Sequence, residues 1–175
     1  AASEYLNTFS KLIRNTLDSS RNELIPFTKD FETIKWYVEL EQMRFRHIFA
    51  FEIKIDERIL NSNTMVPPML VQPFIENAIL HGLVPCDRTD LTLVFEAIMT
   101  DEAIIFIITD NGIGRKKSQA YRTLNLRKSE GINITTQRLK IHNGSLYQPS
   151  DMSIYDLEEG GIATGTRVEI KIYYN

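Results

Sequence analysis

The chain has 175 residues, of which 43% are hydrophobic and 25% are charged, and its net charge is −3. These values are typical of one soluble globular domain with a short extension, large enough to bury a core without disulfides. The small negative charge excludes a generally basic surface for nucleic acid, and the single cysteine, Cys86, cannot form an internal disulfide. No apolar run reaches the roughly 20 residues that a membrane span requires, so we expect a cytoplasmic protein.

Two amphipathic helices are predicted at the start of the chain. The first covers about residues 3–19, where apolar side chains repeat at helical spacing. The second runs from an N-cap at Thr28 to about residue 45. Both apolar stripes favour core packing or a dimer seam over a ligand site. The stripe of the first helix consists of Tyr5, Phe9, Leu12, Ile13 and Leu17.

The rest of the chain predicts a mixed sheet with further helices. The segment 103–109 is almost wholly apolar, which is typical of a central strand covered on both faces. The pattern as a whole predicts an α/β sandwich with helices on one face of the sheet, formed by residues 47–175 and preceded by a helical segment, 1–46. The other expected elements are strands at 49–55, 91–99 and 168–172, short strands near Leu146 and Ile154, and helices at 69–82 and 131–142.

Polar residues at the ends of these elements are candidates for a site. Asn77 and His81 lie four residues apart on a predicted helix and therefore share a face. Asp110 follows the central strand and begins Asp110-Asn111-Gly112-Ile113-Gly114, where a carboxylate suits a ligand amino group and the glycines allow close backbone approach. Gly131 enters a helix whose free N–H groups suit phosphate. Taken alone, each candidate also has a purely structural explanation. Asn77 can be a buried amide, Asp110 can be part of an Asp-Asn-Gly turn, and Gly131 can simply begin a helix.

In their order along the chain, these segments resemble the conserved boxes of the Bergerat-fold ATPases. Glu76-Asn77-Ala78 resembles the N box, Asp110-x-Gly112-x-Gly114 the first glycine box, Gly131 the second and Gly165-Thr166 the third. Within that class the chain is most similar to the LytS/YehU type of sensor histidine kinase. The segments that carry this similarity are Pro68-x-x-x-Gln72-Pro73-x-x-Glu76-Asn77-Ala78-x-x-His81-Gly82, Leu40-Glu41-Gln42-x-Arg44-Phe45 and Arg138-Leu139-Lys140.

The resemblance implies an ATP-binding catalytic domain of the Bergerat fold, and it implies roles for single residues. Asp110 would accept a hydrogen bond from the adenine amino group, with Thr166 supporting the floor beneath it. Asn77 would hold a Mg²⁺ ion that bridges the phosphates. Glu76 and His81 are the implied catalytic residues, and residues 115–130 would form an ATP lid whose cations balance the triphosphate. The other implied nucleotide contacts are Gly112, Ile113, Gly114, Lys116, Gly131, Ile132 and Gly165.

The partners implied by the resemblance lie outside this sequence. The ATP γ-phosphate would pass to a histidine on an upstream helix, since His81 would lie too close to the phosphates and neither His47 nor His142 lies on a suitable long helix. The parent protein would be a homodimer anchored in the bacterial inner membrane. It would serve a response regulator of the LytTR type and would bind no nucleic acid.

Two alternatives stay open. The second glycine box reads Ser129-Glu130-Gly131-Ile132-Asn133-Ile134, without one glycine and the usual asparagine, which fits a nucleotide-sensing module that lacks kinase activity. A Bergerat ATPase that hydrolyses ATP is disfavoured. Pro73 occupies the position, four residues before Asn77, where relatives often place a Glu or Asn, and activation of water needs a base.

Overall fold

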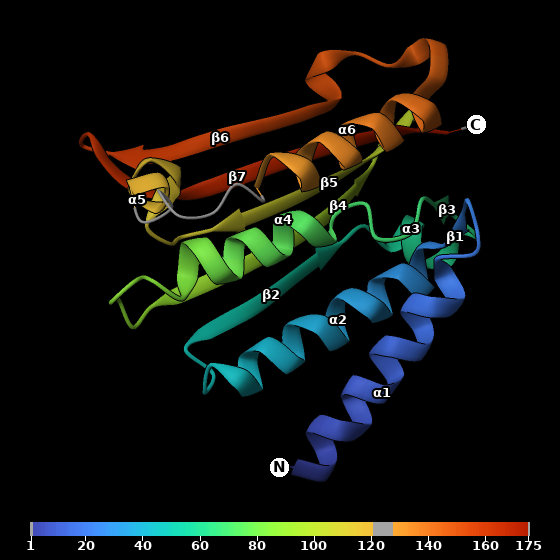
Figure 1. Cartoon of the computed structure of the whole chain (residues 1–175). Helices are drawn as coiled ribbons and strands as arrows, with labels where there is room; N and C mark the ends of the chain where they lie inside the picture. The colour runs from blue at the N-terminus through green and yellow to red at the C-terminus, as the bar shows by residue number, and fades with distance from the viewer. Residues whose placement is uncertain (1, 121–127, 175) are drawn as a thin grey trace.

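The computed structural model describes residues 2–120 and 128–174, with the side chains of 119, 120 and 128–130 left aside. In chain order the described elements are α1 (Ala2–Ser19), β1 (Ile25–Pro26), α2 (Phe27–Arg44), β2 (Phe49–Ile55), α3 (Glu57–Asn61), β3 (Met65–Val66), α4 (Gln72–Asn77), the π-helix η1 (Ala78–Leu83), β4 (Leu91–Met99), β5 (Ala103–Asp110), α5 (Gly114–Ala120), α6 (Lys128–Asn143), the 3-10 helices η2 (Gly144–Leu146) and η3 (Pro149–Asp151), β6 (Met152–Glu159) and β7 (Ile162–Tyr173). Figure 1 shows their arrangement.

The main sheet has five strands in the order β2-β4-β5-β7-β6. β2 runs parallel to β4, and the other neighbouring strands run antiparallel, so the sheet is mixed as predicted. β5 is the middle strand, and most of its residues are buried. The prediction of a central strand at 103–109 is therefore confirmed.

Helices α2, α4 and α6 lie on one face of this sheet (Figure 1). Phe27 and Phe31 of α2 stack on Phe106 and Phe95 of the sheet, with ring centroids 5.9 and 5.7 Å apart. Leu139 of α6 is fully buried in the same core. Because offset aromatic pairs and buried aliphatic side chains dominate core stability, these contacts fix the helix layer on the sheet.

Two helices begin at residues other than those predicted. α2 begins at Phe27 and has no side-chain hydrogen bond at its cap, so the predicted N-cap at Thr28 is wrong. The helix expected to begin at Met69 begins at Gln72, because Met69 has a φ of 57° and a right-handed helix cannot pass through that conformation. Pro73 consequently lies in the first turn of α4, where its missing N–H costs little.

The chain after the central strand also departs from expectation. The segment 115–130, expected to form a lid, includes most of α5, and α6 begins before the predicted start at Gly131, which is its fourth residue. Residues 121–127 of the expected lid lie outside the described residues. The predicted strand near Leu146 is wrong, because this residue lies in η2, whereas the strand near Ile154 is confirmed as β6.

α1 packs along α2 through a narrow set of residues, of which Thr8, Leu12 and Ser19 are buried. Apart from Leu12, the apolar stripe of α1 is therefore exposed, and its use as a dimer seam stays a prediction. None of the helices in the described part of the chain is long and apolar enough to span a bilayer. The exposed apolar residues of α1 are Tyr5, Leu6, Phe9, Ile13 and Leu17.

Candidate functional site

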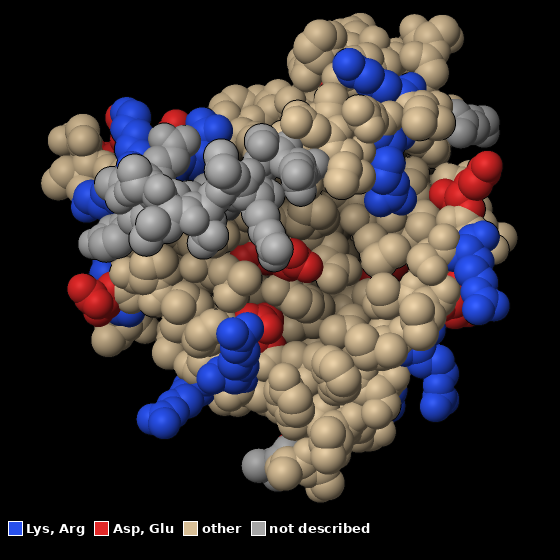
Figure 2. Space-filling view, viewed as in Figure 1, with Lys and Arg blue, Asp and Glu red and all other residues tan. Residues whose placement is uncertain are grey.

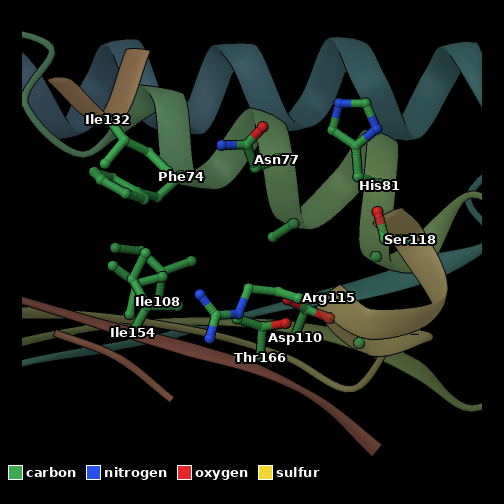
Figure 3. A pocket seen from close by; sticks show the side chains of 14 residues that line it. Phe74, Asn77, His81, Ile108, Asp110, Arg115, Ser118, Ile132, Ile154 and Thr166 are labelled. Carbon is green, nitrogen blue, oxygen red and sulfur yellow. The ribbon is translucent and has the colours of Figure 1, made fainter. Parts of the chain in front are cut away.

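A cavity of about 250 Å³ lies between the helix layer and one end of the sheet. Figure 3 shows Asn77 and His81 on the helix side of this space and Asp110 and Thr166 on the sheet side. Apolar side chains gather at one end of the cavity, and α5 lies at the other. The lining residues are Phe74, Asn77, Ala78, His81, Gly82, Ile108, Asp110, Gly114, Arg115, Ser118, Ile132, Ile154, Thr166 and Val168.

The helix side of the cavity comes from α4 and η1. Phe74, Asn77, Ala78 and His81 follow the spacing i, i+3, i+4 and i+7, which is one face of a helix. The helix changes from α to π geometry after Asn77. Short π segments are rare and are frequent at functional sites. The expectation that Asn77 and His81 share a face is thus met, and both residues line the cavity.

Asp110 supplies a buried carboxylate on the sheet side. Its side chain accepts a hydrogen bond from the Gly112 N–H, at 2.9 Å from Oδ1, and another from the backbone of Thr166, its cross-strand partner on β7. Burial raises the pKa of Asp110 to about 6, and these two hydrogen bonds offset the rise only in part. Backbone donors therefore fix the orientation of a carboxylate that lines the cavity, as an acceptor for a ligand N–H group requires.

Glycines allow the backbone to pack tightly behind Asp110. A Cβ atom at Gly112 would lie 2.2 Å from the carbonyl carbon of Gly82, and one at Gly165 would lie 1.9 Å from the carbonyl oxygen of Asp110. The Ile113 N–H donates to the Gly82 carbonyl over 3.0 Å, which ties the segment after β5 to η1. Gly112, Ile113 and Gly165 thus support the cavity wall from behind, whereas Gly114 lines the cavity itself.

Glu76, expected to be catalytic, is not brought to the cavity. Its carboxylate accepts a hydrogen bond from the Gln72 side-chain amide over 3.2 Å. Partial burial, together with the nearby Glu41 of α2, raises the pKa of Glu76. Glu76 precedes Asn77 by one residue and so lies about 100° around the helix from it. Its side chain accordingly faces α2 outside the cavity lining, and its catalytic role stays a prediction.

Lys116 and Gly131 also lie away from the cavity lining. Lys116 pairs with Glu158 of β6 over 2.9 Å, so its charge is already balanced. A Cβ atom at Gly131 would lie 3.7 Å from Pro73, in ordinary contact and outside the cavity. Figure 2 shows the basic side chains of this face mainly toward its edge.

The sequence analysis did not identify nearly half of the residues that line the cavity. Ile108 precedes Asp110 by two residues, and because side chains alternate along a strand, both point to the same face of the sheet. Phe74 and Ala78 share the helix face of Asn77, but apolar residues on a predicted helix indicate only core packing. Ile154 and Val168 depend on the β6–β7 register, for which the sequence holds no such signal. The missed residues are Phe74, Ala78, Gly82, Ile108, Ile154 and Val168, whereas Arg115 and Ser118 belong to the predicted lid.

Comparison with known sequences finds similar segments in histidine kinases. Residues 1–49 match the family model described as histidine kinase. Over 106 residues the chain is 31% identical to the sensor protein LytS of Bacillus subtilis (strain 168), which covers 60% of this chain and 17% of that protein. Over 85 residues it is 34% identical to the sensor histidine kinase YpdA of Escherichia coli (strain K12), covering 49% of this chain and 14% of that protein. The chain spans less than a fifth of the length of these relatives.

Solved structures share the fold. The mycobacterial sensor histidine kinase MprB superposes with a TM-score of 0.56 at 16% identity, covering 86% of this chain and 96% of that chain. The catalytic domain of the histidine kinase ThkA superposes with a TM-score of 0.55 at 10% identity, covering 86% and 94%. At these identities the likeness shows the fold, and it confirms the α/β sandwich predicted from the sequence.

Proposed function

We propose that this chain, a homologue of the LytS sensor histidine kinases, binds ATP and presents its γ-phosphate to a histidine outside the chain. The observation that carries the proposal is the buried carboxylate of Asp110, which lines a cavity opposite Asn77 and His81. A hydrogen-bond acceptor on one side of the cavity and polar helix residues on the other suit a particular kind of ligand. Such a ligand has a ring with an amino group at one end and charged groups at the other.

The base would occupy the part of the cavity next to Asp110. About 250 Å³ is below the roughly 300–1,000 Å³ usual for a pocket that holds a whole ligand, so the cavity fits the base and leaves the phosphates at its open side. Asp110 would accept a hydrogen bond from the exocyclic amino group of adenine. Apolar residues such as Phe74 and Ile132 would cover the ring (Figure 3).

The phosphates and their metal ion would lie along the helix side. Among the described residues no group of three or more His, Cys, Asp or Glu could hold a metal ion. A Mg²⁺ ion would therefore share its ligands between phosphate oxygens and the amide oxygen of Asn77, a hard donor of the kind that Mg²⁺ accepts. When bound, the metal neutralises phosphate charge, and His81 on the same helix face would contact the phosphates. Catalysis of this kind consists mainly of positioning and charge stabilisation.

The proposal extends to partners that the sequence resemblance implied. The accepting histidine would lie on an upstream helix, the parent would be a membrane-anchored homodimer, and the phosphate would pass to a LytTR-type response regulator. The exposed apolar stripe of α1 supports a helical partner at this end of the chain. A domain that only senses nucleotide is the second candidate. It is favoured by one observation: Arg115 and Lys116, expected to balance the triphosphate, both pair with carboxylates.

Incubation with γ-labelled ATP tests the proposal. The isolated chain should bind Mg–ATP in calorimetry and acquire no acid-labile phosphate, whereas a longer version that includes the upstream helix should become labelled. Tethering supplies much of the effective concentration that transfer needs, so mixing the two parts should give slow labelling only. Stoichiometric labelling of this chain alone would contradict the proposal. A longer protein that binds ATP and is never labelled would favour the sensing module.

A further inference from the structure

Arg115, the first residue of the expected lid, lines the cavity at the sheet side (Figure 3). The guanidinium forms a fork-like ion pair with Asp156 of β6, with Nε 2.7 Å from Oδ1 and Nη2 2.9 Å from Oδ2. Two parallel hydrogen bonds fix the plane of a guanidinium, which a single bond does not. Asp156 therefore holds Arg115 in one orientation at the cavity wall.

The position of this pair is set by the strand register. Asp110 pairs with Thr166 on β7, and Thr166 pairs with Asp156 on β6. Residues directly opposite each other on neighbouring strands point to the same sheet face, so the three side chains form one row. Arg115 reaches from α5 to this row, and its guanidinium lies on the same side of the cavity as Asp110 in Figure 3.

The ion pair also restricts what Arg115 can bind. Its charge is balanced by Asp156, and two of its donor groups are used by the carboxylate. A neutralised guanidinium attracts phosphate less strongly than a free one. Its flat face and remaining N–H groups still suit an aromatic ring that carries acceptor nitrogens. Both the location and the charge therefore favour the base of a nucleotide over its phosphates.

We propose that Arg115, held by Asp156, forms a wall of the base pocket and contacts the purine ring. The inference rests on the proposed function, because it assumes that an adenine nucleotide enters this cavity. It assigns Arg115 to affinity for the base and not to neutralisation of the triphosphate.

The neighbouring ion pair provides a matched control. Lys116 pairs with Glu158 over 2.9 Å, on the same helix and the same strand, but lies away from the cavity. Calorimetry with adenosine, ADP and ATP compares Arg115→Ala with Lys116→Ala, after circular dichroism has shown that both fold. Arg115→Ala should weaken all three ligands by the same factor, about three- to tenfold. Lys116→Ala should leave all three within about twofold of the wild type.

Four results would overturn the inference. A loss that grows from adenosine to ATP would show a phosphate contact, and equal effects of the two substitutions would show that Arg115 only anchors α5. If Arg115→Ala does not fold, Arg115→Lys keeps the charge without the fork or the flat face and should give the same uniform loss; unchanged affinity in that variant would refute the contact. A wild-type chain that binds none of the three ligands would overturn the proposed function itself, and this inference with it.

Discussion

Replacing Asp110 by asparagine should stabilise the unliganded fold and weaken nucleotide binding at the same time. The residue is 4% exposed, and burial raises the pKa of its carboxyl group from 3.8 to about 6. A shift of one pKa unit corresponds to about 1.4 kcal/mol, so ionised Asp110 costs the fold about 3 kcal/mol above pH 6. An amide of the same shape carries no charge and still accepts the Gly112 N–H, so much of this cost should disappear.

The direction of the shift determines the pH dependence. The pKa of Asp110 is higher in the folded than in the unfolded chain, so the folded state binds more protons between about pH 4 and 6. The free energy of unfolding therefore falls as the pH rises through this window, and Asp110→Asn should remove that part of the fall. Burial also raises the pKa of Asp30 to about 6, but this residue is present in both proteins and its contribution cancels in the comparison.

Urea unfolding between pH 4 and pH 8 measures both proteins. The variant should exceed the wild type by up to about 3 kcal/mol at pH 8 and lose this advantage at pH 4. Calorimetry with ADP should show binding at least tenfold weaker, equivalent to about 1.4 kcal/mol. A variant that is less stable than the wild type at pH 8 would refute the cost assigned to the buried carboxylate. A variant that binds ADP with unchanged affinity would refute the assignment of Asp110 as the base acceptor.

Four further substitutions distinguish residues that bind the nucleotide from residues that support the fold. Asn77→Ala should reduce ATP affinity by at least about tenfold with Mg²⁺ and much less without it in calorimetry, because the amide oxygen suits the metal; equal losses would mean a structural amide. Glu76→Gln should leave ATP affinity within about twofold, since its carboxylate faces α2, and a tenfold loss would return it to the site. Gly112→Ala should lower the free energy of unfolding in urea by at least about 2 kcal/mol, because its Cβ would lie 2.2 Å from Gly82; Gly131→Ala, whose Cβ has room, should not lower it.

The fold was predictable from the sequence where local pattern decides it. Strands 49–55 and 91–99 were placed correctly because alternating side chains report the two faces of a strand. The start of α4 was not predictable, because it depends on a contact across the fold. The Met69 N–H donates to Asp30 Oδ1 over 2.8 Å, and this contact accompanies the left-handed conformation that delays the helix.

The candidate site was likewise predictable from the sequence only in part. The motifs identified the polar residues Asn77, His81 and Asp110, all of which line the cavity. The ion pair between Arg115 and Asp156 joins residues 41 positions apart, and it exists only because β6 lies beside β7. A long-range register of this kind has no local signature, so the wall that it forms could be found only in the folded chain.

The displacement of Glu76 explains why the sequence signature is longer than the cavity requires. Gln72 of the α4 segment donates to Glu76, and the Glu76 carboxylate lies near Glu41 of α2, a residue of the other segment that carried the resemblance. In that same segment the Gln42 side-chain amide donates to the Phe49 carbonyl over 3.0 Å, which joins α2 to β2. One face of the α4 helix thus lines the cavity, while the adjacent face carries Glu76 toward Glu41 of α2. Glu41 belongs to residues 1–49, the part of the chain that matches the histidine kinase model, so the two segments that carried the resemblance lie near each other in the fold.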